Sequence, residues 1–181
     1  MSLRDITKDL HAIAEGTKAS HLLVSGDVTK EQYRSYLYQL IAIYGPIEFS
    51  GKVQGFFQPI KDDPRLPKIY QDYAELADPA VADTWLPETV EYMTYLFALI
   101  NDPARRHLIK AHGYIRLMGD MAGGQLLGKT VPGSRRMFQF KTPPSELKFQ
   151  MLPEFTDDLG DEARVAFTYF IKIMKAFGGE A

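Results

Sequence analysis

The chain has 181 residues, a net charge of −2 and no cysteine. This length suits one compact domain with a sizeable core, and we expect a single domain over residues 1–181. The near-neutral charge gives no electrostatic reason to expect nucleic acid as a partner, and the lack of cysteine excludes disulfides, thiolate metal ligands and cysteine nucleophiles.

No run of about 18 consecutive apolar residues occurs, so the sequence predicts no membrane span. The first residues, MSLRDITKDLHAIAEG, also lack the apolar core of a signal peptide. We therefore expect a cytoplasmic protein, and nothing in the composition demands more than a monomer.

Helical spacing of apolar residues dominates the chain and predicts five helices, over residues 3–14, 28–48, 87–100, 103–129 and 161–177. Thr29 is the expected N-cap of the second helix, and Pro87 opens the third in the favoured first turn. Proline-containing connections are predicted at 56–68, 78–81 and 141–155. No long alternating stretch indicates a sheet, so the expected fold is an all-α, multi-helix bundle.

Residues 116–129, RLMGDMAGGQLLGK, contain four glycines within a predicted helix, although each glycine costs a helix interior about 1 kcal/mol relative to alanine. At 100° per residue, Gly113, Arg116, Gly119, Asp120, Gly123 and Gly124 fall on one face, opposite an apolar stripe. Three interpretations remain open. The glycines serve close helix–helix packing, or they cradle a phosphate, or a broad, flat ligand lies on them beneath Asp120.

His11 is the histidine with the most suggestive neighbours. No glutamate in the chain is followed by histidine three residues later, which argues against a carboxylate-bridged metal pair. Glu15 lies one helical turn after His11 and can hold the second ring nitrogen of a metal-ligating imidazole. Arg4 lies two turns earlier, about 10 Å along a helix that rises 1.5 Å per residue. The alternative is an ordinary polar pair on a solvated helix.

Two segments, TKDLHAIAE (7–15) and HGYIRLMGDMAGGQ (112–125), resemble the proximal-histidine and distal-helix motifs of mammalian-like haem oxygenases. The resemblance implies a haem sandwiched between a proximal helix and a glycine-rich distal helix. It implies the following roles: His11 as axial iron ligand, Glu15 as its partner, Gly119, Gly123 and Gly124 as distal glycines, Asp120 as distal carboxylate with Tyr44 and Arg116 in its network, and Arg4 and Tyr114 as contacts of the haem propionates.

The activity implied by this resemblance is an oxidoreductase reaction that uses O2 and electrons to cleave haem into biliverdin, CO and Fe2+. Haem is then both cofactor and substrate, and a ferredoxin or a reductase supplies the electrons, because no flavin or dinucleotide motif is present. Two alternatives are a haem carrier or sensor without turnover and a thiamin-related hydrolase of the same helical fold.

The last third of the chain departs from the resemblance in two places. Gln150 and Glu154 stand near positions where relatives carry basic residues for the propionates, and Lys148 is a nearby substitute. Phe170 and Met174 stand where relatives often have asparagine and phenylalanine.

Overall fold

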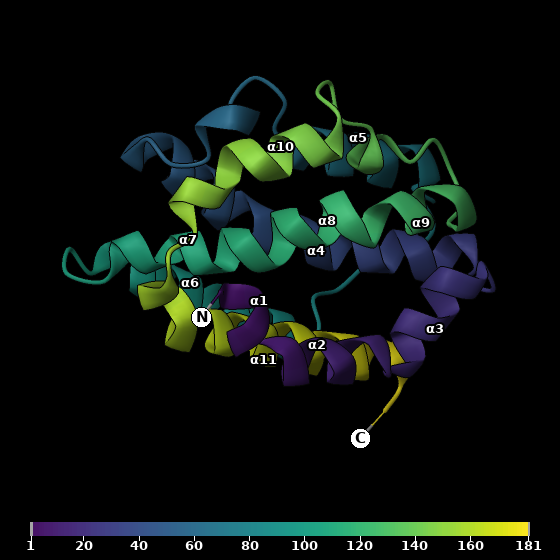
Figure 1. The fold of residues 1–181 in the computed structure, drawn as a ribbon. Coiled ribbons are helices and arrows are strands. Elements are labelled where there is room, and N and C mark those ends of the chain that lie inside the picture. The colour runs from purple at the N-terminus through teal and green to yellow at the C-terminus, as the bar shows by residue number, and fades with distance from the viewer. Residues whose placement is uncertain (1, 181) are drawn as a thin grey trace.

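The computed structural model describes residues 2–180, which form packed helices without a β-strand (Figure 1). The predicted all-α class is therefore confirmed. The helices are α1 (Leu3–Ile6), α2 (Lys8–Glu15), α3 (Lys18–Ser25), α4 (Lys30–Gln54), α5 (Arg65–Leu76), α6 (Pro87–Asn101), α7 (Ile109–Gly113), α8 (Gly119–Ala122), α9 (Gly124–Thr130), α10 (Pro144–Met151) and α11 (Gly160–Gly178). Short 3₁₀ turns lie at Gln58–Ile60, Arg106–Leu108, Arg136–Phe138, Leu152–Glu154 and Asp157–Leu159.

The helix predicted over 3–14 is two helices, which meet at Thr7. The Thr7 hydroxyl donates to the Leu3 carbonyl at 2.8 Å, and a side chain that bonds back to the main chain competes with regular continuation of a helix. Arg4 and His11 therefore lie on successive helices, and the predicted spacing along a single straight axis is wrong.

The long helix α4 passes through the middle of the fold and contacts α5, α6 and α7. It begins as predicted at Thr29, whose hydroxyl accepts from the Gln32 amide at 3.1 Å while the Gln32 side chain accepts from the Thr29 amide at 2.9 Å. The helix continues through Pro46 to Gln54, beyond the predicted end.

Three helices, α3, α5 and α10, lie where no helix was predicted. In α5 and α10 the misleading residue is proline: Pro67 falls in the first turn of α5, and Pro144 is the first residue of α10. Proline lacks a backbone N–H. In the first turn of a helix that N–H would have no hydrogen-bond partner within the helix, so proline is tolerated there.

Residues Ile109–Thr130 form one continuous helical path, called here the glycine-rich helix. It consists of α7, a π-helical segment at Tyr114–Met118, then α8 and α9. The predicted start at residue 103 is too early, because residues before Ile109 form a turn and a 3₁₀ segment.

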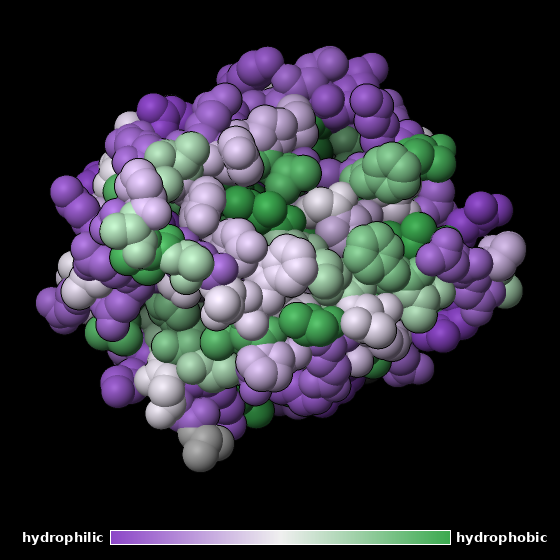
Figure 2. Space-filling view, turned by 180° about the vertical axis from the view of Figure 1, so that it is seen from behind, coloured by the Kyte–Doolittle hydropathy of each residue, from purple (hydrophilic) through white to green (hydrophobic). Residues whose placement is uncertain are grey.

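The glycine-rich helix lies in front of α4, with α10 above it and α2 and α11 below it (Figure 1). A buried hydrogen bond of 2.9 Å from His112 Nε2 to Glu162 joins α7 to α11, and Tyr92 contacts His112 Nδ1 at 2.7 Å. His112 is thus a satisfied core histidine. The opposite face of the molecule gathers neutral and apolar side chains in its middle and hydrophilic ones at its rim (Figure 2).

Candidate functional site

The glycines of the glycine-rich helix separate into two kinds. Apart from its neighbours along the helix, a Cβ on Gly119 would meet no atom of residues 2–180 within 4 Å, and one on Gly123 would meet only the Gly119 carbonyl at 3.7 Å. A Cβ on Gly124 would lie 2.7 Å from the ring of Phe138, and one on Gly128 would lie 3.2 Å from the Cβ of Phe138. Gly119 and Gly123 therefore border open space, whereas Gly124 and Gly128 make room for Phe138.

This arrangement decides between the three interpretations of the glycines. Among the described residues no helix packs on Gly119 and Gly123, so close helix–helix packing is not their purpose. No strand precedes them within residues 2–180, which removes the phosphate-binding loop. A bare helical surface open to a ligand is the interpretation that remains. The sequence placed Gly113 and Gly124 on that surface as well, but the structure turns Gly113 toward Phe57 and Gly124 toward Phe138.

Arg116 and Asp120 differ from the prediction in the same way, because both are buried rather than exposed beside Gly119 and Gly123. The cause is the π-helical segment that contains Arg116. Its i→i+5 hydrogen bonds place more residues in each turn than an α-helix does, so a wheel drawn at 100° per residue assigns the wrong faces beyond Tyr114.

The buried side chains of Tyr44, Arg116 and Asp120 form one group, called here the distal cluster. The Tyr44 hydroxyl donates a short hydrogen bond to Asp120 Oδ2, and Arg116 Nη2 lies 3.4 Å from Asp120 Oδ1. Burial raises the pKa of Asp120, while the Arg116 charge and the Tyr44 hydrogen bond oppose that rise. Burial and the Asp120 charge raise the pKa of Tyr44 well above its ordinary value, so the phenol keeps its proton.

Two aromatic residues near Arg116 were missed as members of the site. The Arg116 guanidinium carbon lies 4.5 Å from the ring centre of Phe170 on α11. Burial raises the pKa of Tyr36, and the Arg116 charge and a side-chain hydrogen bond from Arg116 lower it. Tyr36 and Tyr44 are both buried on α4. They lie eight residues apart, a spacing that places both on one helix face, and this spacing was the available sequence signal.

His11 lies on α2 with its side chain 60% exposed, and its Nδ1 is 3.5 Å from a carboxylate oxygen of Glu15. The imidazole and the ring of Phe167 on α11 pack edge to face, with ring centres 5.9 Å apart. The predicted pairing of His11 with Glu15 is present, and the imidazole remains accessible.

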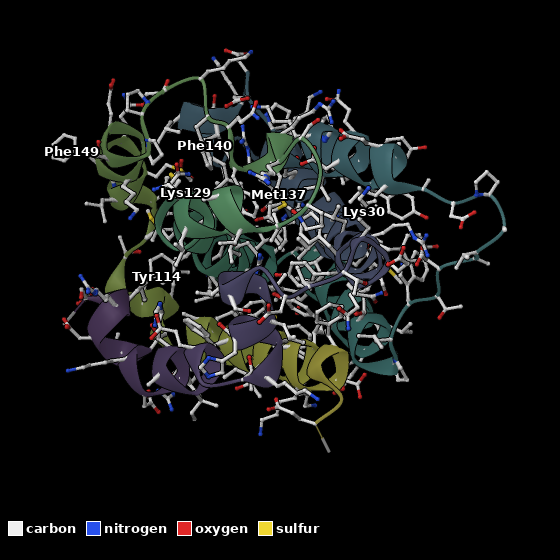
Figure 3. The ribbon with its side chains drawn as sticks, turned by 90° about the vertical axis from the view of Figure 1, so that its right-hand side faces the viewer. Lys30, Tyr114, Lys129, Met137, Phe140 and Phe149 are labelled. Carbon is white, nitrogen blue, oxygen red and sulfur yellow. The ribbon has the colours of Figure 1, made fainter. Side chains whose placement is uncertain are left out.

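Arg4 on α1 lies near Tyr114, the first residue of the π-helical segment. Burial raises the pKa of Tyr114, and the charge of Arg4 lowers it, so the two side chains are close enough to interact. Figure 3 shows Tyr114 between α1 and α2 on one side and α10 on the other. The rings of Phe155 and Tyr114 pack edge to face, with their centres 5.2 Å apart.

In the described part of the chain, the exposed imidazole of His11 does not belong to a cluster of metal-binding side chains. Within residues 2–180 no group of three or more histidine, aspartate or glutamate side chains is placed to hold a metal ion. A hollow of about 370 Å³ lies beyond the open glycines, near Lys129 and Phe138, and its lining contains none of the predicted site residues. No helix among the described residues is long and apolar enough to cross a membrane.

Comparison with known proteins identifies the family of this chain. The sequence profile of the Heme oxygenase family matches residues 1–142. The chain belongs to the haem oxygenase family. Heme oxygenase 1 of Bos taurus is 26% identical over 205 residues, which cover 98% of this chain and 71% of that protein. The heme oxygenase of Takifugu rubripes is 30% identical over 149 residues, which cover 75% of this chain and 51% of that protein.

Solved structures of haem oxygenases share the fold. Heme oxygenase-1 of the cyanobacterium Synechocystis, in complex with heme, superposes with a TM-score of 0.79 at 21% identity, covering 98% of this chain and 90% of that one. The heme oxygenase of Leptospira interrogans gives a TM-score of 0.79 at 19% identity, covering 97% and 100%. Membership of the haem oxygenase family makes the chain a haem-degrading enzyme, which the sequence predicted.

Proposed function

We propose that this chain binds haem between α2 and the glycine-rich helix and cleaves it with O2 to biliverdin, CO and Fe2+. The observation that carries the proposal is the surface at Gly119 and Gly123, which is free of side chains and has the buried distal cluster directly behind it. The proposed domain spans residues 1–181 and acts in the cytoplasm as a monomer.

The residues present fit haem. A single accessible imidazole can hold iron only if another group supplies the remaining ligands, and the porphyrin nitrogens do so. A flat macrocycle needs a wide surface without side chains, which the two open glycines provide. When bound, the haem supplies both the iron that activates O2 and the carbon skeleton that is cleaved.

His11 would hold the iron of a bound haem through Nε2, because its Nδ1 faces Glu15 at 3.5 Å. A carboxylate that accepts from Nδ1 fixes the tautomer and leaves Nε2 as the metal-binding nitrogen. Phe167 packs against one side of the imidazole. A neutral histidine donates less electron density to iron than a thiolate does.

Asp120 is the proposed proton-handling residue on the opposite side. Its two oxygens accept from Tyr44 and Arg116, and a carboxylate has about four acceptor positions, so capacity remains for an ordered water at the open surface. Because Gly119 and Gly123 bring no side chain to this surface, protons reach it through such a water rather than from a bulky acid.

Arg4 and Tyr114 are the proposed partners of the haem propionates. Arg4 is exposed and positively charged, and the Tyr114 hydroxyl lies within the range of its charge. Arg4 lies on α1, and Tyr114 lies between α1 and α10 (Figure 3). Lys148 on α10 is a further cation for the same purpose. Electrons come from a separate ferredoxin or reductase.

The test is to titrate the purified protein with haemin while following the Soret band, and then to add a reductant and O2. We expect a 1:1 complex whose Soret band decays into a broad red bilin absorption, with CO trapped as it forms. A stable complex that yields no bilin would identify a haem carrier and contradict turnover. Failure to form a complex would contradict the assignment of His11 and the open glycine surface.

A further inference from the structure

The guanidinium of Arg116 is buried without a full set of polar partners. It has five N–H donors, and its Nε finds no hydrogen-bond acceptor among residues 2–180. Its contact with Asp120 Oδ1 is long, at 3.4 Å, and therefore weakly directional. Arg116 also donates to the hydroxyls of Tyr36 and Tyr44, but its Nε faces no acceptor among these residues, so a contact of another kind can help to fix where this charge lies.

The ring of Phe170 is placed to make that contact. The Arg116 guanidinium carbon lies 4.5 Å from the Phe170 ring centre, and 5.6 Å from that of Tyr44. A guanidinium within about 6 Å of a ring centre is attracted by the negative charge density of the ring face, and more strongly where water is excluded. Phe170 comes from α11, whereas the rest of the cluster comes from α4 and the glycine-rich helix.

We infer that Phe170 is a positioning residue of the distal cluster, and that its ring holds the Arg116 guanidinium beside Asp120. The inference rests on the roles proposed above for Arg116 and Asp120. Phe170 itself transfers no proton. It acts through the position of a positive charge that the carboxylate of Asp120 needs nearby.

A purely space-filling role would give a different pattern of effects. An aliphatic side chain fills much of the same volume but offers no charge density to a cation. If Phe170 only fills space, its replacement by leucine changes kcat by the same factor whether or not residue 116 is charged. If Phe170 holds the guanidinium, the effect of leucine depends on Arg116.

The first measurement uses the protein without haem. In 15N-labelled protein, the Arg116 Nε–H resonance reports the adjacent ring, and Phe170→Leu should remove that ring-current shift. Phe170→Tyr keeps the aromatic face and should preserve it. Phe140→Leu is the matched control, since the ring centre of Phe140 lies 4.1 Å from the guanidinium carbon of another buried arginine, Arg65. An Arg116 resonance unchanged in Phe170→Leu overturns the inference.

The second measurement is a double-mutant cycle on biliverdin formation at saturating haem. Phe170→Leu should lower kcat by about 2- to 30-fold, the range that a cation–π contact supports, with Phe170→Tyr close to the parent. In an Arg116→Met background the same change should have no further effect. An equal loss in both backgrounds overturns the inference. Normal turnover of Arg116→Met overturns the proposed role of Arg116 and the inference with it. In that case Phe170→Leu still changes the Arg116 Nε–H resonance, which distinguishes failure of the proposed role from absence of the contact.

Discussion

Phe167 and Phe170 lie three residues apart on α11 and contact opposite sides of the proposed haem site. Phe167 packs on the imidazole of His11 with ring centres 5.9 Å apart. The ring centre of Phe170 lies 4.5 Å from the guanidinium carbon of Arg116. Residues three apart on a helix share a face, so one stretch of α11 supports both the proximal and the distal side. A shift of α11 would move both supports together.

Asp120→Asn should retain haem binding and lose at least 10-fold in biliverdin formation. The amide keeps the size of the carboxylate but cannot carry its charge or accept and release a proton, and proton transfer by a positioned group is worth about 10²- to 10⁴-fold. The haem complex should instead oxidise an added phenol in a peroxidase-like reaction. Soret titration and bilin yield measure the two effects, and a normal yield would sink the role assigned to Asp120.

Tyr44→Phe should move the acid limb of the kcat/KM profile to higher pH. Burial raises the pKa of Asp120, and the hydrogen bond from Tyr44 opposes that rise, so losing it lets the pKa rise further. The carboxylate then gains its proton at a higher pH and is ionised over a narrower range. Tyr33→Phe is the control, because the Tyr33 hydroxyl donates to Met137 Sδ at 3.7 Å instead. A similar shift in both variants would contradict the assignment.

The same Tyr44→Phe variant should also lose stability in a pH-dependent way. At neutral pH the missing hydrogen bond to a buried carboxylate should cost about 1–3 kcal/mol in the free energy of unfolding. Because the folded-state pKa of Asp120 is raised, this carboxylate takes up its proton as the pH falls through that pKa. The difference between variant and parent should therefore narrow in acid. Urea unfolding at several pH values measures it, and a constant difference would argue against an ionised Asp120.

Alanine at Gly119 or Gly123 should affect haem without harming the fold. Both glycines have ordinary right-handed helical angles, and a Cβ there meets open space, so the unfolding free energy without haem should stay equal or rise by up to about 1 kcal/mol. Haem affinity or turnover should fall, because the new methyl group occupies the ligand surface. Unchanged haem binding and turnover in both variants would place the haem elsewhere.

Gly124→Ala should behave in the opposite way. Its Cβ would lie 2.7 Å from the Phe138 ring, which must move, and overpacking of this kind costs about 1–3 kcal/mol. Thermal unfolding of the haem-free protein should therefore separate Gly124→Ala from the other two glycine variants. Equal stability of all three would contradict the division of the glycines into two kinds.

His11→Ala should leave the haem-free protein stable to within about 0.5 kcal/mol, since the side chain is 60% exposed. Turnover should be lost, and added imidazole should restore part of it by entering the space of the missing ring. His21→Ala, which removes an exposed histidine from α3, is the control. Full activity of His11→Ala without imidazole would mean that another residue binds the iron.

The parts of the fold that follow from local patterns were predicted correctly. Thr29 as a cap and the helix from Pro87 depend only on neighbouring residues, and both are present. The helix α5 was missed because Pro67 was interpreted as a loop residue, although it falls in a first turn.

Within the site, the residue types were easier to predict than the direction in which each side chain points. The cluster of Tyr44, Arg116 and Asp120 is present, but the faces of the glycine-rich helix were not predictable, because a π-helical segment leaves no periodic signal in one sequence. The packing of Phe138 on Gly124 and of Phe170 on Arg116 joins residues that are distant in sequence, so it becomes visible only once the helices are assembled.

Haem bound at the open surface of Gly119 and Gly123 would also stabilise the folded protein. A ligand that fills such a surface only in the folded state stabilises it by RT ln(1 + [L]/Kd), about 2.7 kcal/mol at a free haem concentration one hundred times Kd. Each departure of bilin withdraws that stabilisation. Proteases that attack the unfolded chain would then remove the enzyme faster when haem is scarce, so its abundance would follow the supply of haem without a separate sensor.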